Sequence, residues 1–278
     1  MTFRNLMVTI LFMIMLFFLV AGNCFSDELD RFKGEKQILR ISGGTAHIPV
    51  MKEAAKRIMT FNPDIRITIA GGGSGAGIKQ VGEGLVDIGN SGRKATEAEI
   101  NKYGLKMIKW AIDGVAAVVN PKNRIKTLTR QELQDIFSGK ITNWKELGGN
   151  DKPINVYTRD KASGTRSVFW KKALKKSDIT NKANVVVSNG AMKTAVKIDP
   201  YSIGYISVGF INDSVFAIVL DGVKPTLDSV KQGHYKVARG LYSNTKGDAK
   251  GLAKKFIDYL LGPDGRKMVL EKGFIPVN

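Results

Sequence analysis

Hydrophobic and polar positions follow two different periods along most of the chain. Short apolar, β-branched runs at residues 38–41, 65–69 and 203–206 predict β-strands. Between such runs, apolar residues recur every three to four positions, as at Val50 and Ala54, which predicts amphipathic helices. Strands that alternate with helices are typical of an α/β fold with parallel or mixed sheets flanked by helices.

The number of expected strands favours two lobes. Further strands are expected at residues 86–93, 111–120, 153–157, 184–188, 215–220 and 237–242. This is too many for one compact sheet, so we predict two α/β lobes without an internal repeat. Residues 111–120 would form the first connection, and the return connection would lie within residues 216–242. We therefore assign residues 37–115 and 240–278 to the first lobe and residues 116–239 to the second.

The first 26 residues differ from the rest of the chain. Arg4 is the only charged residue before Asp27, and residues 6–21 are almost wholly apolar. This run is short for a membrane-spanning helix, whereas a basic start and an apolar centre are typical of a secretory signal. We expect a signal peptide at residues 1–26, cleaved after Gly22 or after Ser26, and a periplasmic protein. An uncleaved anchor and lipidation at Cys24 are the less favoured alternatives.

Charge and cysteine content narrow the classes of partner. The formal net charge is +18, which could indicate binding to nucleic acid or to an anionic membrane. The lysines, however, are scattered opposite apolar helix faces, and no basic stripe interleaved with aromatic residues is present. We expect a solvated basic surface that raises encounter rates with anions, and no nucleic-acid binding. Cys24 is the only cysteine, so no intramolecular disulfide can form.

Residues 156–169 carry the clearest signal for a ligand site. A strand there is followed by Ser163, Gly164 and Thr165, which open a helix. A helix start presents unpaired N–H groups and the positive end of the helix dipole. Arg159 adds a planar set of charged donors, so the stretch is suited to a small oxyanion. An ordinary helix cap is the alternative interpretation.

The same pattern recurs at three other strand ends. Donor-rich turns occupy residues 42–47, 71–77 and 90–93, and ligands of open α/β sheets lie outside the carboxyl ends of the strands. Residues 71–76 also fit a dinucleotide-binding fingerprint. That fingerprint requires an acidic residue at the end of the next strand, where residues 90–93 offer none.

Catalysis is a further alternative with weak support. Ser163 as a nucleophile would need a base, and the chain has only His47 and His234, neither in a setting typical of a catalytic triad. No His pair or carboxylate set has the spacing of metal ligands. We therefore expect no enzyme activity, no cofactor and no metal, and we expect His47 to be a surface residue at a helix start.

Four ordered motifs resemble those of PstS-type phosphate-binding proteins of bacterial ABC importers, which belong to the periplasmic substrate-binding superfamily. They are residues 136–144, Arg159 with residues 163–166, residues 203–205 and residues 262–266. The resemblance extends from about residue 38 to the C-terminus. It implies a type II periplasmic-binding-protein fold, in which two lobes joined by hinge strands close on phosphate. It also implies a monomer that delivers phosphate to a membrane ABC permease.

Carried over by motif, the resemblance implies that the phosphate-binding residues are Thr45, Ala46, Ser74, Ser91, Gly92, Arg159, Ser163, Gly164 and Thr165. The chain departs from the family at Gly92, where the best-known branch has an aspartate that accepts the proton of hydrogen phosphate and rejects sulfate. Ser91 could accept that proton instead. Binding or sensing of another tetrahedral oxyanion such as sulfate is therefore the alternative function. Arg93 either reaches the anion or pairs with a surface carboxylate such as Glu97.

Overall fold

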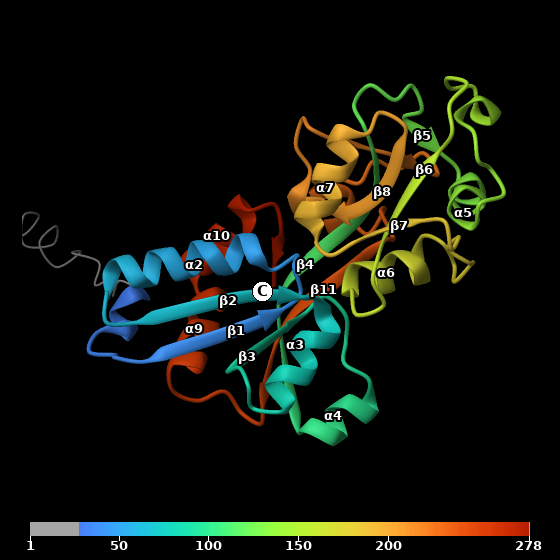
Figure 1. The fold of residues 1–278 in the computed structure, drawn as a ribbon. Helices are drawn as coiled ribbons and strands as arrows, with labels where there is room; N and C mark the ends of the chain where they lie inside the picture. Colours follow the sequence, from blue (N-terminus) through green and yellow to red (C-terminus); the bar gives the residue numbers. More distant parts are fainter. Residues whose placement is uncertain (1–27, 278) are drawn as a thin grey trace, which may run out of the picture.

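The computed structural model describes residues 28–277, so the expected signal peptide and Cys24 lie outside the described residues. The elements divide into two lobes (Figure 1). The first lobe contains η1 (Glu28–Phe32), β1 (Ile38–Gly43), α2 (Ile48–Phe61), β2 (Arg66–Gly72), α3 (Gly73–Gly82), β3 (Ile88–Ser91), α4 (Glu97–Tyr103), α9 (Gly251–Leu261) and α10 (Pro263–Glu271).

The second lobe is formed by the middle of the chain. It contains β5 (Thr127–Leu128), α5 (Arg130–Ser138), η2 (Trp144–Leu147), β6 (Asn155–Arg159), α6 (Gly164–Lys172), β7 (Asn184–Val186), α7 (Asn189–Ile198), β8 (Ser202–Ser207), η3 (Val208–Phe210), β9 (Phe216–Ala217), β10 (Val219–Leu220) and α8 (Leu227–Lys231). The order of strands and helices confirms the expected mixed α/β architecture. The boundaries expected between the lobes stay a prediction.

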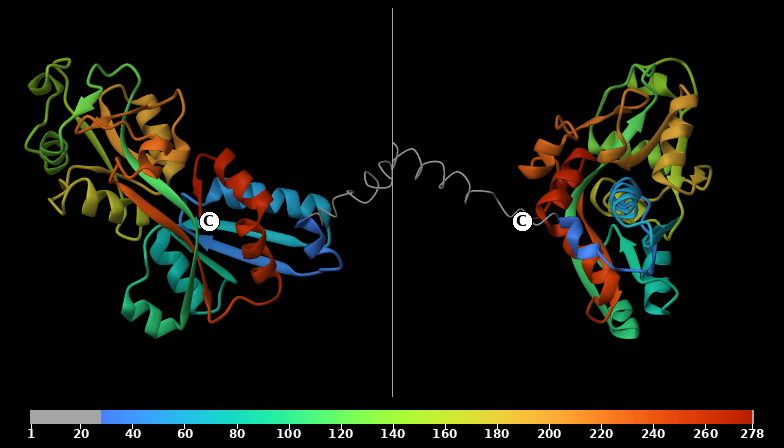
Figure 2. Two further views of the ribbon diagram at one scale, coloured as in Figure 1. Left: turned by 180° about the vertical axis from the view of Figure 1, so that it is seen from behind. Right: turned by 90° about the vertical axis from the view of Figure 1, so that its left-hand side faces the viewer.

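Two long strands, β4 (Leu105–Val119) and β11 (Ala238–Lys246), connect the lobes. The main sheet has the strand order β2-β1-β3-β11-β4-β8-β6-β7. The first part of β4 pairs antiparallel with β11, and its last five residues pair antiparallel with β8 in the second lobe. The short strand β12 (Ile275–Pro276) also pairs with β4. Figure 2 shows both long strands running from one lobe into the other. One strand therefore fixes the orientation of both lobes.

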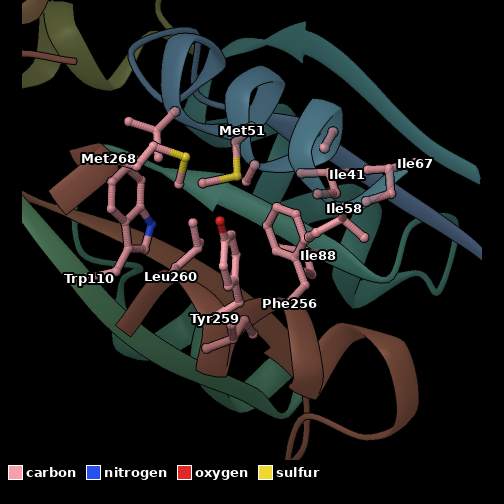
Figure 3. Packing of buried hydrophobic residues seen from close by; sticks show 14 of the residues in the cluster. Ile41, Met51, Ile58, Ile67, Ile88, Trp110, Phe256, Tyr259, Leu260 and Met268 are labelled. Carbon is pink, nitrogen blue, oxygen red and sulfur yellow. The ribbon is translucent and has the colours of Figure 1, made fainter. Parts of the chain in front are cut away.

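Each lobe has its own hydrophobic core. In the first lobe, Met51 of α2, Trp110 of β4 and Phe256 and Leu260 of α9 are fully buried and point into one core (Figure 3). The second core is centred on aromatic contacts: Phe169 stacks on Tyr205 at 4.2 Å between ring centroids, and Phe137 packs against Phe169 at 5.1 Å. Separate cores allow each lobe to move as a unit.

Several strand expectations differ from the structure. The strand expected at residues 111–120 begins already at Leu105, and those expected at residues 86–93 and 184–188 are shorter, at Ile88–Ser91 and Asn184–Val186. Residues 215–220 form two short strands rather than one, because β9 pairs with β4 and β10 pairs with β5. The segment therefore leaves one sheet for another after Ala217. The return strand β11 continues to Lys246, beyond the expected limit at residue 242, because it stays paired with β4 as far as Leu105.

The expectation that His47 is a surface residue is wrong, because its side chain is fully buried at the start of α2. Its Nδ1 lies 3.0 Å from the carbonyl oxygen of Gly44, and its ring meets that of Trp110 edge-on at 5.5 Å. Since a carbonyl only accepts, Nδ1 carries the hydrogen. Burial, and then the positive charge of Arg239, lower the pKa of His47 to about 3. The imidazole is therefore neutral in the folded protein.

We predict that His47 makes the fold sensitive to acid. The pKa of His47 is about 3 when folded against 6.5 for a free histidine, so the unfolded chain binds the proton more tightly. Stability is therefore lost as the pH falls below 6.5, by about 2 kcal/mol between pH 7 and pH 5. His47→Gln should remove about that part of the loss, as measured by urea unfolding at the two pH values. His234→Gln, at an exposed histidine, is the control. An unchanged loss in His47→Gln would contradict the prediction.

Candidate functional site

The donor-rich turns lie at the strand ends of both lobes. The turn before α2 follows β1, and the start of α3 follows β2. Ser91 is the last residue of β3 and Gly92 follows it, and the start of α6 follows β6. Because β1 is parallel to β2 and β3, their carboxyl ends meet at one edge of the sheet. The three donor-rich turns of the first lobe therefore lie side by side at this edge.

The start of α3 in the first lobe contacts the start of α6 in the second. The N–H of Gly75 donates to the carbonyl of Ala162 at 3.0 Å. Gly164 packs directly on the hydroxyl of Ser74, so that a Cβ at position 164 would overlap the Ser74 oxygen. Only glycine fits there, and a larger residue would push the two helix starts apart.

Asn189 makes a second contact between the lobes. Thr45 Oγ1 accepts hydrogen bonds from the backbone N–H of Asn189 at 3.3 Å and from its Nδ2 at 3.1 Å. Asn189 Oδ1 in turn accepts from the N–H of Ser207 at 3.0 Å, and the side chain is fully buried. Sequence reasoning missed Asn189, although Ser188 and Asn189 repeat the strand–hydroxyl–helix pattern seen at the other turns.

Three hydroxyls at this junction act as acceptors towards the protein. Ser74 Oγ accepts from the N–H of Gly92 at 2.9 Å, Ser163 Oγ accepts from the N–H of Arg166 at 3.2 Å, and Thr45 Oγ1 accepts from Asn189. A hydroxyl that accepts still has one hydrogen to donate. The protein therefore leaves each of these groups free to donate to an added acceptor. Thr165 Oγ1 and the N–H of Ala46 form no hydrogen bond within residues 28–277.

Arg159 carries a buried positive charge with incomplete pairing. Its side chain is 2% exposed, and Nη2 donates to the carbonyl of Val187 at 2.9 Å. Nε and Nη1 are buried without any hydrogen-bond partner among the described residues. Burial lowers the pKa of Arg159, and the charge of Arg239 acts in the same direction. An unpaired buried guanidinium is costly, and an anion would supply the missing acceptors.

A second buried arginine lies beside the site. Arg239 of β11 donates from Nε and Nη2 to Oδ2 of Asp113 on β4, at 2.9 and 2.8 Å. Asp113 Oδ1 accepts from the hydroxyl of Ser207 at 2.7 Å. The guanidinium lies against Gly92, where an added Cβ would be 2.7 Å from Nη1. Sequence reasoning missed this pair, although an aspartate within the apolar run 111–120 was a signal for it.

Ser91 and Arg93 are both engaged within the protein. Ser91 Oγ donates to the carbonyl of Arg93 at 3.0 Å and accepts from Nδ2 of Asn244 at the same distance. Arg93 forms two hydrogen bonds with Glu99, at 2.7 and 2.8 Å, which hold the pKa of Glu99 at about 2. Of the two alternatives for Arg93, the structure has the surface ion pair, with Glu99 in place of Glu97.

The described residues contain no group of three or more His, Cys, Asp or Glu side chains placed to hold a metal ion. Within the same range, every helix is too short or too polar to cross a membrane.

The structure thus brings Ser74, Gly92 and Gly164 into direct contact and ties Thr45 to the second lobe. Arg159 lies at the end of β6, close enough to Arg239 for their charges to interact. Ser163 caps α6, as the sequence predicted, and Ala46 is buried beside Thr45. Which of these residues touch a ligand stays a prediction.

Comparison with known proteins places the chain in a family. Residues 32–264 match PBP_like_2, a PBP superfamily domain. The phosphate-binding protein PstS of Bacillus subtilis is 41% identical over 92% of this chain and 87% of its own length. The PstS of Borreliella burgdorferi is 29% identical over 87% of this chain and 91% of its own length.

Solved structures give the same result. One is a phosphate ABC transporter substrate-binding protein with bound phosphate from Clostridium perfringens, described as putative in its own report. It has a TM-score of 0.82 and 38% identity, covering 87% of this chain and all of the other. A phosphate transport receptor of the ABC type from Vibrio cholerae has a TM-score of 0.69 and 35% identity, covering 85% of this chain and 99% of the other. These relatives are named as binding proteins rather than enzymes. The chain therefore belongs to the PBP superfamily, within the family of PstS proteins.

Proposed function

We propose that this protein binds inorganic phosphate between its two lobes and delivers it to a membrane ABC permease. The observation that carries the proposal is Arg159, a buried guanidinium at the end of β6, two of whose nitrogens find no partner among the described residues. The proposed ligand groups are Thr45, Ala46, Ser74, Ser91, Gly92, Arg159, Ser163, Gly164 and Thr165. The names of the relatives support phosphate as the ligand.

The donors suit a small, fully dehydrated anion. Within the described residues, the hydroxyl oxygens of Thr45, Ser74 and Ser163 only accept hydrogen bonds, so their hydrogens are available to the ligand. Helix starts add backbone N–H groups and the positive end of the dipole. Each charge-assisted hydrogen bond contributes about 1.5–3 kcal/mol, and several of them offset the desolvation of the anion.

Binding between lobes links the ligand to closure. Ser74 and Thr45 come from the first lobe, and Arg159 and Ser163 from the second. A ligand that bonds to both sets favours the conformation in which they are close. We propose that this closed form is what the permease recognises. We also propose that the protein is an exported, periplasmic monomer that binds no nucleic acid.

The alternatives find less support. The relatives are named for phosphate, which does not favour sulfate as the main ligand. A hydrolase that uses Ser163 would need a base, but His47 is buried with Nδ1 directed to Gly44. We therefore propose binding without catalysis.

We predict that the phosphate-stripped protein binds phosphate tightly and sulfate much more weakly. Calorimetric titration with each anion at low and at moderate salt measures this directly. Binding through buried donors should persist at moderate salt, because buried pairs are screened less than exposed ones. Equal affinity for both anions would contradict phosphate selectivity, and no heat with either would refute the proposed function.

We predict that Arg159→Met abolishes phosphate binding without lowering the stability of the phosphate-free protein. The substitution removes a buried charge that the protein leaves partly unpaired, and it keeps an unbranched apolar side chain. Phosphate at about 100 times its Kd should stabilise the wild type by about 2.7 kcal/mol and leave the variant unchanged. Thermal unfolding with and without phosphate measures both effects. Arg124→Met, at an exposed arginine, is the matched control.

We predict that Asn189→Ala weakens phosphate binding several-fold. The variant loses the hydrogen bond from Nδ2 to Thr45 across the lobes, worth about 1 kcal/mol, and so disfavours closure. The backbone N–H survives, so the loss should correspond to roughly one bond. Asn181→Ala, at an exposed asparagine of the same lobe, serves as the comparison in calorimetry. Equal affinities of the two variants would contradict a role of Asn189 in closure.

A further inference from the structure

We propose that Arg239 presents Nη1 beside Gly92 to the bound anion and so makes the site prefer the divalent form of phosphate to the monovalent form. The inference rests on the proposed function and adds a residue from the connecting strand β11 to the ligand groups.

The orientation of the guanidinium is fixed from one side. Nε and Nη2 both donate to Oδ2 of Asp113, at 2.9 and 2.8 Å, and together they occupy one edge of the planar group. Asp113 is itself held by Ser207, whose hydroxyl donates to Oδ1. Both charged side chains are almost fully buried, at 3% and 0% exposure. The pair is thus rigid, and Nη1 is left on the opposite edge.

Gly92 packs against one face of the guanidinium, nearest to Nη1. A Cβ at position 92 would lie 2.7 Å from Nη1, 3.0 Å from Cζ and 3.3 Å from Nε, so the absence of a side chain there makes room for Arg239. Gly92 is also in contact with the donor cluster. Its N–H donates to Ser74 Oγ, and Gly164 packs against its carbonyl carbon. Nη1 therefore lies at the border of the proposed phosphate site and forms no hydrogen bond within the described residues.

A guanidinium nitrogen can only donate. An unprotonated oxygen can accept a hydrogen bond from Nη1, whereas a protonated oxygen that faces Nη1 is disfavoured. The divalent form of phosphate has three unprotonated oxygens against two in the monovalent form, and its larger charge is attracted more strongly by the guanidinium. The charged and titratable groups around Arg239 do not change this preference. Asp113 is committed to Arg239 and Ser207, His47 is neutral, and Arg159 is a second donor. The site should therefore favour the divalent form of phosphate over the monovalent form, because two guanidinium groups lie close together and the carboxylate of Asp113 is already paired. This preference acts between the two forms of phosphate and is separate from the rejection of sulfate, which is also divalent.

The test compares the Kd of inorganic phosphate at pH 6 and pH 8, measured by calorimetry. Phosphate passes from mostly monovalent to mostly divalent over this range. The variants are Arg239→Met, the double variant Asp113→Asn/Arg239→Met, and Gly92→Ala. The double variant avoids an unpaired buried carboxylate, which would destabilise the single variant. Circular dichroism checks the fold of each protein.

We expect the wild type to bind more tightly at pH 8 than at pH 6. The double variant should lose about tenfold or more in affinity at pH 8, the value of one charge-assisted hydrogen bond. It should lose less affinity at pH 6, so that the ratio of its affinities at pH 8 and pH 6 is smaller than in the wild type. Gly92→Ala should act in the same direction, because its methyl group displaces Nη1 while both charges remain. Gly190→Ala, where the added methyl group meets only the Ser188 hydroxyl at 3.7 Å, is the matched control.

The outcomes separate this inference from the proposed function. If the wild type binds no phosphate, the proposed function fails and the inference fails with it. If the wild type binds phosphate but the double variant keeps its affinity and its pH ratio, the Asp113–Arg239 pair only joins the strands, and this inference alone is overturned. Loss of affinity in equal proportion at both pH values would also overturn it, because a donor that selects the divalent form must act more strongly at pH 8.

Discussion

The architecture depends on one strand that belongs to both lobes. β4 pairs with β11 over most of its length and then with β8, so the backbone hydrogen bonds of a single strand orient the parts of the main sheet that lie in the two lobes. The apolar character of β4 follows from this position, because its last seven residues are buried. Asp113 interrupts the apolar run at the point where the lobes meet. Its partner Arg239 stands directly opposite in the register of β11.

The site uses the same groups for structure and for ligand chemistry. Ser163 caps α6, Ser74 holds the turn at Gly92, and Thr45 receives Asn189 from the other lobe. In each case the hydroxyl oxygen accepts a hydrogen bond within the protein, while the hydroxyl hydrogen stays available to an oxygen of the ligand. The helix-cap interpretation of Ser163 and the ligand interpretation are therefore compatible. Arg159 is different, because two of its buried nitrogens have no hydrogen-bond partner anywhere in residues 28–277, and their burial does not stabilise the fold.

The sequence predicted those parts of the site that are formed by residues close together in the chain. The helix start at Ser163 and the donor-rich turns after β1, β2 and β3 follow from cap residues, glycines and apolar periodicity. Asn189 and Arg239 were missed because their partners, Thr45 and Asp113, are 144 and 126 positions away in the sequence. The burial of His47 was missed for a similar reason, since Trp110, which packs on its ring, comes from the distant strand β4. The surroundings of these three residues depend on which strands pair in the sheet, and a single sequence carries little information about strand pairing.

The contacts between the lobes have a consequence for how affinity is set. Gly75 with Ala162, and Asn189 with Thr45, are bonds between protein groups and need no atom of a ligand. Part of the free energy of closing is therefore intrinsic to the chain. The measured dissociation constant equals the constant of the competent conformer divided by its population before binding. Substitutions at these contacts would tune the apparent affinity through the resting equilibrium between conformers, with every group that touches the anion left in place.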